Sequence, residues 1–535
     1  MTNPRPLLVL AARQAAHGAR LIAALFAFTM ISQPAASAVD VRLVELDRAQ
    51  ALQPVDRFFD QAIGADYPGT TGREDSLAQL KTTVDELGFR QVRFHAIFHD
   101  VLGTVRTVNG RAVYDFSGID RLYDELLARH VRPLVELGFT PAAMASSPQT
   151  IFYWKGNTSH PDPAAWQALV EAFARHIVQR YGIKEVQDWP FEVWNEPNLA
   201  GFWEGADQKA YFELYASTAR TLKNVDARLR VGGPSTAGAD WVVPFLAYAR
   251  EHAVPVDFVT THTYGVDGGF LDENGVDDRK LSASPDAIVG DVRRVHEQIK
   301  ASHLPTLPLY ITEWSTSYNP RDLVHDSYIS AAYILAKLHA VRGLAQAMSY
   351  WTFSDLFEEP GPPPTPFHGG FGLMTREGIR KPAFFAYKYL HALAGNDIPS
   401  HDDGVLASAD GERTAVVVWD WQQPVQDVSN RPFFGKPVPA TPSRPVELRI
   451  AHVGAGSYRL QVHRTGYRVN DAFTAWLDMG KPASLDVGQL RRLNALTADT
   501  PESDSMVTLI AGGVLSTTIS MRSNDIVLVT LEPAR

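Results

Sequence analysis

Two glutamates, each at the end of a short apolar run, are the residues of this sequence best placed to do chemistry. Glu196 follows the run Phe191–Trp194, and Glu313 lies near the end of the run Leu309–Trp314. If both runs are strands of one parallel barrel, both side chains lie at its carboxyl end, where barrel enzymes carry their active sites. A protonated carboxyl group opposite an ionised one can cleave a glycosidic bond. The pair therefore predicts Glu196 as general acid and Glu313 as nucleophile.

Eight short apolar runs between about residues 55 and 395 are the strands that would position these groups. They are Gln61–Ala65, Arg90–Phe98, Arg132–Phe139, Phe191–Trp194, Leu229–Gly233, Asp257–His262, Leu309–Trp314 and Ala347–Phe353. Stretches with apolar residues three and four apart separate them and predict helices: Ser76–Leu87, Ala164–Tyr181, Gln208–Val225, Pro285–Ile299 and Ser327–Val341. This alternation predicts a (β/α)₈ barrel. The alternative, a doubly wound open sheet, usually begins with a glycine-rich turn that is absent here.

The pattern of apolar residues changes after Gly395, where helical periodicity nearly vanishes. The remaining strand-like runs, separated by Gly, Pro, Asn and Asp clusters, predict a β-sandwich over residues 396–535: Thr414–Trp421, Pro445–Ala451, Tyr458–His463, Met506–Ile510 and Asp525–Leu531. The strand-like start of segment 39–54 is expected to join this sandwich.

The bulk composition excludes several classes of protein. A net charge of −10 leaves no excess of Lys and Arg to neutralise phosphates, so we expect no nucleic-acid partner. The chain has no cysteine, which removes cysteine nucleophiles and cysteine metal sites. Residues 1–38 read as a signal peptide with a short apolar run and cleavage after Ala38, so we expect export and no stable membrane association.

No set of residues has the spacing of a metal site. His99, Asp100 and His160 do not form a convincing ligand set, and paired histidines at metal-binding spacing are absent. The acidic run Asp272–Asp278 is expected to be a solvated loop. We therefore predict no metal and no cofactor.

Several segments together carry a resemblance to a known family. Asn195-Glu196-Pro197 after the fourth strand, with Glu313 after the seventh, resembles the clan of retaining (β/α)₈ glycosidases. Within that clan the chain resembles glycoside hydrolase family 39, which holds β-xylosidases and α-L-iduronidases. The segments that carry this match are Val92–His95, Trp194–Leu199, Thr261–Gly265, Tyr350–Asp355, Phe367–Leu373 and Asn470–Phe473. The match covers nearly the whole chain after residue 38 and is closer to the xylosidases.

The resemblance implies further site residues and a substrate. We expect sugar contacts from His95, Asn195, His262, Tyr264, Trp351 and one of Glu358 and Glu359, with Glu359 favoured. Phe202 and Trp154 either flank the site or belong to the core. The implied activity is an exo-acting β-xylosidase that releases xylose from xylo-oligosaccharides.

Two alternatives to this activity remain open. The first is the same machinery acting on an arabinoside, glucoside or uronide. Thr263 and Tyr264 stand where the iduronidases carry a basic pair, which argues against an acidic sugar. The second is a non-catalytic carbohydrate-binding barrel, which would be expected to lack one of the two glutamates.

Overall fold

The protein is built on a closed barrel of parallel strands, seen here in a computed structural model that describes residues 40–272 and 274–534. Neighbouring strands follow one another along the chain around this barrel. In order they are β3 (Ala62–Gly64), β4 (Gln91–Phe94), β7 (Arg132–Leu137), β10 (Pro190–Val193), β11 (Arg230–Thr236), β12 (Phe258–Tyr264), β15 (Leu309–Ser315) and β16 (Ala347–Tyr350). The predicted (β/α)₈ barrel is confirmed, and the open doubly wound sheet is wrong.

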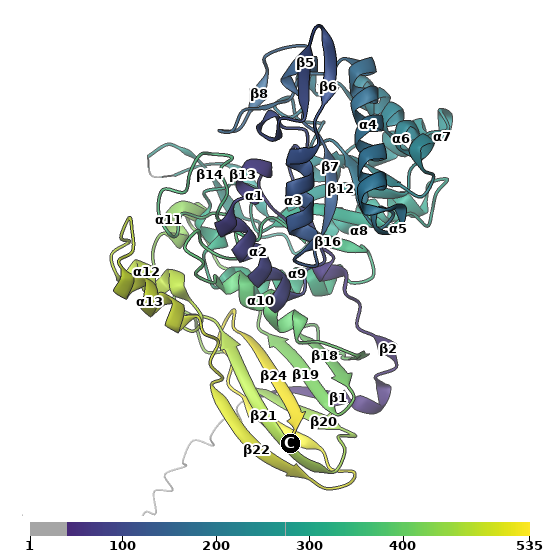
Figure 1. Ribbon diagram of the computed structural model, residues 1–535. Helices are drawn as coiled ribbons and strands as arrows, with labels where there is room; N and C mark the ends of the chain where they lie inside the picture. Colours follow the sequence, from purple (N-terminus) through teal and green to yellow (C-terminus); the bar gives the residue numbers. More distant parts are fainter. Residues whose placement is uncertain (1–39, 273, 535) are drawn as a thin grey trace, which may run out of the picture. The chain divides into compact units, whose positions relative to one another are not determined.

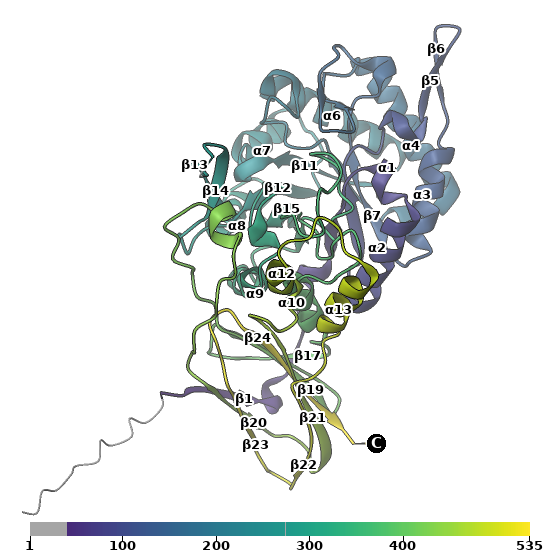
Figure 2. The same ribbon diagram turned by 90° about the vertical axis from the view of Figure 1, so that its left-hand side faces the viewer.

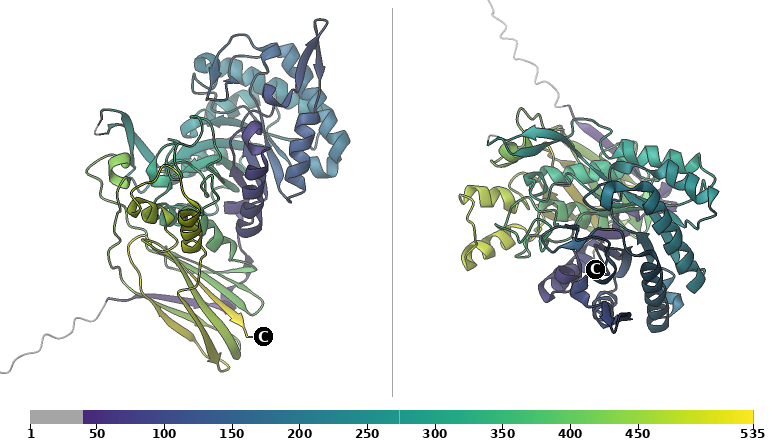
Figure 3. Two further views of the ribbon diagram at one scale, coloured as in Figure 1. Left: turned by 60° about the vertical axis from the view of Figure 1, so that its left-hand side comes forward. Right: turned by 90° about the horizontal axis from the view of Figure 1, so that it is seen from above.

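Helices surround the barrel strands (Figures 1 and 3). They are α1 (Pro68–Thr71), α2 (Glu74–Leu87), α3 (Ser117–Leu127), α4 (Pro163–Tyr181), α5 (Ile183–Val186), α6 (Gln208–Val225), α7 (Val242–Glu251), α8 (Val289–Lys300), α9 (Ile329–Ala340) and α10 (Pro382–His391). Helix α4 shows why these segments are helical. The Asp162 side chain accepts a hydrogen bond from the Ala165 N–H, and Pro163 fits the first turn. Its buried face carries Trp166, Leu169 and Phe173 against the barrel.

Three hairpins enlarge the loops that follow barrel strands. They are β5 (Val105–Val108) with β6 (Arg111–Tyr114), β8 (Thr150–Ile151) with β9 (Gly156–Asn157), and β13 (Val266–Leu271) with β14 (Asp277–Leu281). The β5–β6 hairpin projects away from the barrel (Figure 2). The expected solvated acidic loop at 272–278 is confirmed only in part, because residues 274–277 are exposed but its two ends are not. Asp272 and Asp278 are buried, and both accept hydrogen bonds from Arg431.

Two sheets make up the C-terminal region (Figure 2). The larger has the order β2 (Gln53–Pro54), β17 (Asn396–Ile398), β18 (Val405–Asp410), β19 (Arg413–Trp419), β24 (Ile526–Pro533), β21 (Gly456–Thr465) and β22 (Ser503–Leu509). The smaller has the order β1 (Arg42–Asp47), β20 (Val446–Ala451) and β23 (Leu515–Ile519). Side chains from both sheets form one apolar cluster, so the region is a β-sandwich. Strand β1 pairs in parallel with β20.

This region also contains helices that the sequence did not indicate: α11 (Asn430–Phe434), α12 (Ala472–Asp478) and α13 (Val487–Leu496). Short 3₁₀ turns complete the described chain, namely η1 (Arg48–Gln50), η2 (Phe58–Asp60), η3 (Asp100–Leu102), η4 (Ala142–Met144), η5 (Glu204–Ala206), η6 (Ala237–Ala239) and η7 (Leu323–His325). No helix in residues 40–272 and 274–534 is long and apolar enough to cross a membrane. The predicted signal peptide lies outside the described residues.

Candidate active site

A cavity of about 620 Å³ lies at the carboxyl ends of the barrel strands. It is lined by His95, Phe152, Asn195, Glu196, Leu199, Phe202, Ala237, Gly238, Tyr264, Val266, Asp291, Glu313, Tyr318, Pro320, Trp351, Glu359, Pro360 and Phe371. Every residue predicted for the site lines this cavity except His262, which is fully buried behind it. The ends of the predicted strands thus bring these side chains together around one cavity.

The two predicted catalytic carboxyl groups face each other in this cavity. One carboxylate oxygen of Glu196, one of Glu313 and a ring nitrogen of His262 all lie within 4.8 Å of one another. The His262 Nδ1 atom is 2.9 Å from Glu196 Oε1 and 3.5 Å from Glu313 Oε2. His262 therefore contacts both glutamates from a fully buried position and does not line the cavity, where the resemblance implied a sugar contact.

The backbone around Glu196 is bent to present its side chain. Trp194 and Glu196 have φ angles of 71° and 43°, in the left-handed region that side-chain-bearing residues rarely adopt. Each such residue costs about 1–3 kcal/mol, so the surrounding structure must hold it. The Glu196 N–H donates to the Ser235 carbonyl at 2.8 Å, and the Trp194 indole N–H donates to the Phe202 carbonyl at 2.7 Å. Strain at this turn is the local cost of aiming the carboxyl group.

A single buried guanidinium connects the barrel interior to the nucleophile candidate. Arg93 on β4 donates to Glu313 Oε1 at 2.7 Å and to Glu192 Oε2 at 2.6 Å. Its remaining nitrogen is 2.8 Å from the Asn195 amide oxygen and 3.0 Å from Glu136 Oε2. Hydrogen bonds of this kind favour a charged carboxylate, and Tyr264 adds another to Glu313 Oε2 at 2.7 Å.

Sequence reasoning missed this inner layer of Arg93, Glu136 and Glu192. The signal was present, since each is a charged residue with an apolar residue on either side of it in the sequence. Charged residues are almost never fully buried unless they are paired. An arginine and two glutamates on neighbouring strands could therefore have been read as one buried ionic cluster.

The environment of Glu196 differs from that of Glu313. Burial raises the pKa of Glu196 to about 7, because desolvation outweighs the attraction of His95 and Arg93. Glu196 also has no hydrogen bond from an arginine in the described structure. Glu196 is thus suited to hold a proton near neutral pH, while Glu313 accepts hydrogen bonds from Arg93 and Tyr264.

His95 and Glu359 form a second polar pair in the cavity. The His95 ring is 2.7 Å from Glu136 Oε2 through Nδ1 and 3.1 Å from Glu359 Oε1 through Nε2. Burial alone would lower the pKa of His95, but the facing carboxylates raise it well above its usual value. Burial also raises the pKa of Glu359 to about 7. Glu358 instead points outward and pairs with Arg73 at 3.1 Å.

Aromatic side chains complete the walls of the cavity. The buried Trp351 ring lies 4.8 Å from the His95 ring, and the Arg93 guanidinium lies 5.5 Å from the Trp351 centroid. Phe202 lines the cavity. Trp154 does not line it but donates its indole N–H to buried Asp66 at 3.1 Å. Asp66, which sequence reasoning also missed, accepts a further hydrogen bond from the Glu358 N–H at 2.8 Å and so fixes the segment that carries Glu359.

Comparison with known proteins decides the family. The profile described as "Glycosyl hydrolases family 39" matches residues 42–515. The chain belongs to glycosyl hydrolase family 39. It is therefore a glycoside hydrolase, and the cavity built on Glu196 and Glu313 is the candidate active site of a family 39 enzyme.

Solved and curated family members resemble the chain along most of its length. A family 39 enzyme from Xanthomonas axonopodis pv. citri is 64% identical, with a TM-score of 0.92 over 92% of this chain and 98% of its own. A monomeric β-xylosidase from Caulobacter crescentus CB15 is 62% identical, with a TM-score of 0.91 over 92% of this chain and all of its own. A β-xylosidase from Geobacillus stearothermophilus is 35% identical over 88% of this chain and 92% of its own.

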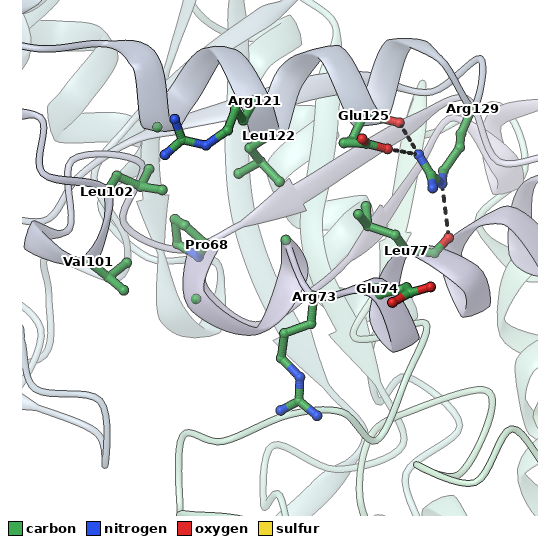
Figure 4. Close-up of a pocket in the computed structure, with 13 residues that line it drawn as sticks. Pro68, Arg73, Glu74, Leu77, Val101, Leu102, Arg121, Leu122, Glu125 and Arg129 are labelled. Carbon is green, nitrogen blue, oxygen red and sulfur yellow. Dashed lines mark hydrogen bonds and ion pairs between the residues drawn. The ribbon is translucent and has the colours of Figure 1, made fainter.

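Two other features of this family 39 enzyme resemble functional sites. A second cavity, of about 550 Å³, lies beside α1, α2, η3 and α3 (Figure 4). In its wall Arg129 donates to Glu125 and to the Leu77 carbonyl, and Arg73 pairs with Asp75. Within the described residues, Glu196, His262 and Glu313 have the geometry to hold a metal ion, although we predicted none. A cation bound there would occupy the space between the two carboxylates.

Proposed function

We propose that this family 39 enzyme is a retaining, exo-acting β-xylosidase, with Glu196 as acid/base and Glu313 as nucleophile. The observation that carries this proposal is the approach of the two carboxylates, whose nearest oxygens lie within 4.8 Å. Retaining glycosidases hold the two groups about 5–5.5 Å apart, and inverting enzymes need about 6.5–9.5 Å to admit a water. The β-xylosidase relatives support the choice of sugar.

The proposed reaction has two displacement steps. Glu313 attacks the anomeric carbon as the glycosidic bond breaks, and Glu196 gives its proton to the leaving oxygen. The product of this step is a glycosyl ester on Glu313 and an ionised Glu196. In the second step Glu196 takes a proton from a water molecule, whose oxygen attacks the anomeric carbon and releases Glu313. The sugar leaves with its original configuration.

The shape of the cavity supports exo action. At one end lie the buried residues His95 and Trp351 and the 10% exposed side chain of Glu359, whose carbonyl accepts a hydrogen bond from the Tyr153 N–H at 2.8 Å. At the other end Leu199 and Tyr318 are 41% and 43% exposed. A cavity closed at one end and open at the other holds a terminal sugar and lets the remainder of the chain extend outward.

The charges in the cavity support a neutral sugar. None of the described residues that line it is a lysine or an arginine, while four are carboxyl groups: Glu196, Asp291, Glu313 and Glu359. A uronic acid would need a cation to compensate its carboxylate. The protonated His95 is already paired with Glu136 and Glu359. This lining disfavours a uronide and fits a pentose without a charged C5 substituent.

A panel of nitrophenyl glycosides, followed by product analysis on xylo-oligosaccharides, tests the proposal. We expect β-xyloside to be the best substrate, xylose to be released one unit at a time, and the first-formed xylose to be the β anomer by NMR. A faster iduronide reaction would refute the choice of sugar. Release of the α anomer would refute the retaining mechanism.

We also propose that the enzyme is exported after cleavage following Ala38. The support is the composition of residues 1–38, with its apolar run and small residues before the cleavage point. N-terminal sequencing of the protein from the periplasm or medium should begin at Val39. Recovery of the intact chain from the cytosol alone would contradict export.

A further inference from the structure

The open end of the active-site cavity has its own set of residues. It is formed by segments that follow β10, β11, β12 and β15: Leu199, Ala237, Gly238, Val266, Asp291 and Tyr318. Glu196, which must protonate the leaving oxygen in the proposed reaction, also follows β10. The closed end is formed by segments that follow β4, β7 and β16. The leaving group therefore lies over the open end.

Asp291 in the first turn of α8 is held in a fixed orientation in this wall. Its Oδ2 atom accepts a hydrogen bond from the Thr263 hydroxyl at 2.7 Å, and its Oδ1 atom accepts one from Arg294 at 2.5 Å. Each carboxylate oxygen has two acceptor positions, so each keeps one free. The side chain is 34% exposed on a cavity-lining residue, so these positions are open to donors such as sugar hydroxyls.

The neighbouring wall at η6 is held by several hydrogen bonds. Gly238 and Ala239 have φ angles of 66° and 57°, and the Asn198 side chain bonds both the N–H and the carbonyl of Ala237, at 2.9 and 3.0 Å. Arg294 also donates to the Gly238 carbonyl at 3.3 Å. Because Asn198 belongs to the same turn as Glu196, the wall and the acid are positioned together.

Tyr318 is an exposed aromatic residue that the proposed chemistry does not use. It lines the cavity mouth, with the Arg279 guanidinium 4.8 Å from its ring centroid and the Tyr264 ring 6.2 Å away, edge to face. These contacts fix the ring, although 43% of the residue remains exposed. The apolar face of a pyranose packs on such a ring, which would bury this surface.

We propose that Asp291 and Tyr318 form a leaving-group subsite that binds the neutral sugar on the reducing side of the scissile bond. Asp291 accepts hydrogen bonds from hydroxyls of this sugar, and Tyr318 provides the surface on which its ring packs. This inference rests on the proposed function, since it assumes that Glu196 protonates the leaving oxygen. In this proposal the open end makes the enzyme prefer a substrate whose leaving group is a sugar to one whose leaving group is a small ion.

The test compares substrates that share the transferred sugar but differ in the leaving group. β-Xylobiose presents a sugar to the subsite, whereas xylosyl fluoride presents only a fluoride ion. For Asp291→Ala and Tyr318→Ala, the ratio of kcat/KM on xylobiose to kcat/KM on the fluoride should fall about tenfold, the size of one lost hydrogen bond to a charged group. Tyr318→Phe keeps the ring and should largely retain the ratio.

A matched control separates this effect from general damage. Asp286 precedes α8, pairs with Arg293 and does not line the cavity, so Asp286→Ala should leave the ratio at its wild-type value. Damage to the fold would lower kcat/KM on both substrates by the same factor and leave the ratio unchanged. An unchanged ratio in Asp291→Ala and Tyr318→Ala would therefore overturn the subsite.

Transfer to an added sugar gives a second readout. Xylose or xylobiose that intercepts the glycosyl-enzyme must bind where the leaving sugar was, so both alanine variants should lower the ratio of transfer to hydrolysis. Equal transfer in variants and wild type would count against the subsite. If the wild type cleaved no xyloside, the proposed function would fail instead. The same ratios would then be measured with the fluoride and disaccharide of the sugar that the panel identified.

Discussion

The barrel mouth and the interior of the C-terminal sandwich are buried in opposite ways. At the mouth, Arg93, Glu136 and Glu192 are fully buried and joined to Glu313. Between the two sheets the buried cluster consists of side chains such as Val416, Leu448 and Val527. Apolar burial stabilises a fold, whereas a buried ionic network costs desolvation that its pairing only offsets. The contrast shows that the mouth is built for chemistry and that stability comes from elsewhere in the chain.

The largest expected effect is at the nucleophile. Glu313→Ala should lower kcat by at least about 10⁴-fold, because covalent catalysis is lost while the fold is kept. Azide should restore part of the turnover by attacking from the vacated face, giving an α-xylosyl azide. Labelling the wild type with a fluorinated xyloside and mapping the peptide checks the assignment. A label on any residue other than Glu313 would refute the assignment. Glu358 lies outside the cavity, so Glu358→Gln is the control and should keep its kcat.

The second-largest loss of activity is expected at the proposed acid, Glu196. Glu196→Ala should lower kcat/KM on xylobiose by about 10²–10⁴-fold, the usual contribution of general acid catalysis. On nitrophenyl xyloside the first step should survive, because nitrophenolate leaves without a proton. The second step should then limit the rate, so a burst of nitrophenol and an accumulated glycosyl-enzyme are expected by stopped flow and mass spectrometry. Equal losses on both substrates would break the assignment.

Activity per folded molecule, and not stability, should separate the two regions. Arg93→Met removes the shared partner of three carboxylates and should lower the free energy of unfolding by about 3–5 kcal/mol, with loss of activity. Leu448→Ala in the sandwich should lower it by about 2–5 kcal/mol. Per folded molecule, however, Leu448→Ala should keep its kcat. Denaturant unfolding with active-site titration measures both quantities, and loss of kcat in Leu448→Ala would remove the contrast.

The smallest effect concerns pH. Burial raises the pKa of Glu196 to about 7, and the acid must be protonated to act. On xylobiose, kcat/KM should therefore fall as pH rises above about 7, approaching tenfold per unit. This alkaline limb should vanish in Glu196→Ala. Burial also raises the pKa of Glu359 to about 7, so Glu359→Gln is the necessary control. Loss of the alkaline limb in that variant would assign the limb to Glu359 instead of Glu196.

Local patterns in the sequence were enough to predict the barrel. Each of the eight apolar runs contains or overlaps a barrel strand, and α4 begins at Pro163, one residue before the predicted start at Ala164. The hairpins of the barrel loops were not predicted, since they are short and lie largely outside the core. Helices α12 and α13 were missed because each has only two or three turns, too few for a helical period to stand out.

The site was predictable only in part, because its inner layer depends on distant pairings. Glu196 and Glu313 could be found from the ends of strands. The pairing of Arg93 with Glu313 joins β4 to β15, and no local pattern encodes it. The buried position of His262 beside the two carboxylates is likewise set by the register of β12 beside β15, which places His262 opposite Glu313.

The parallel pairing of β1 with β20 has a consequence for the order in which the parts of the chain fold. Arg42 is in register with Val446, so the first described strand has no partner until nearly the whole chain has been synthesised. Contacts between residues so distant in sequence form late, since closing the intervening loop costs chain entropy first. The barrel is therefore expected to fold ahead of the smaller sheet. A ribosome-bound chain truncated before residue 446 should leave β1 open to protease.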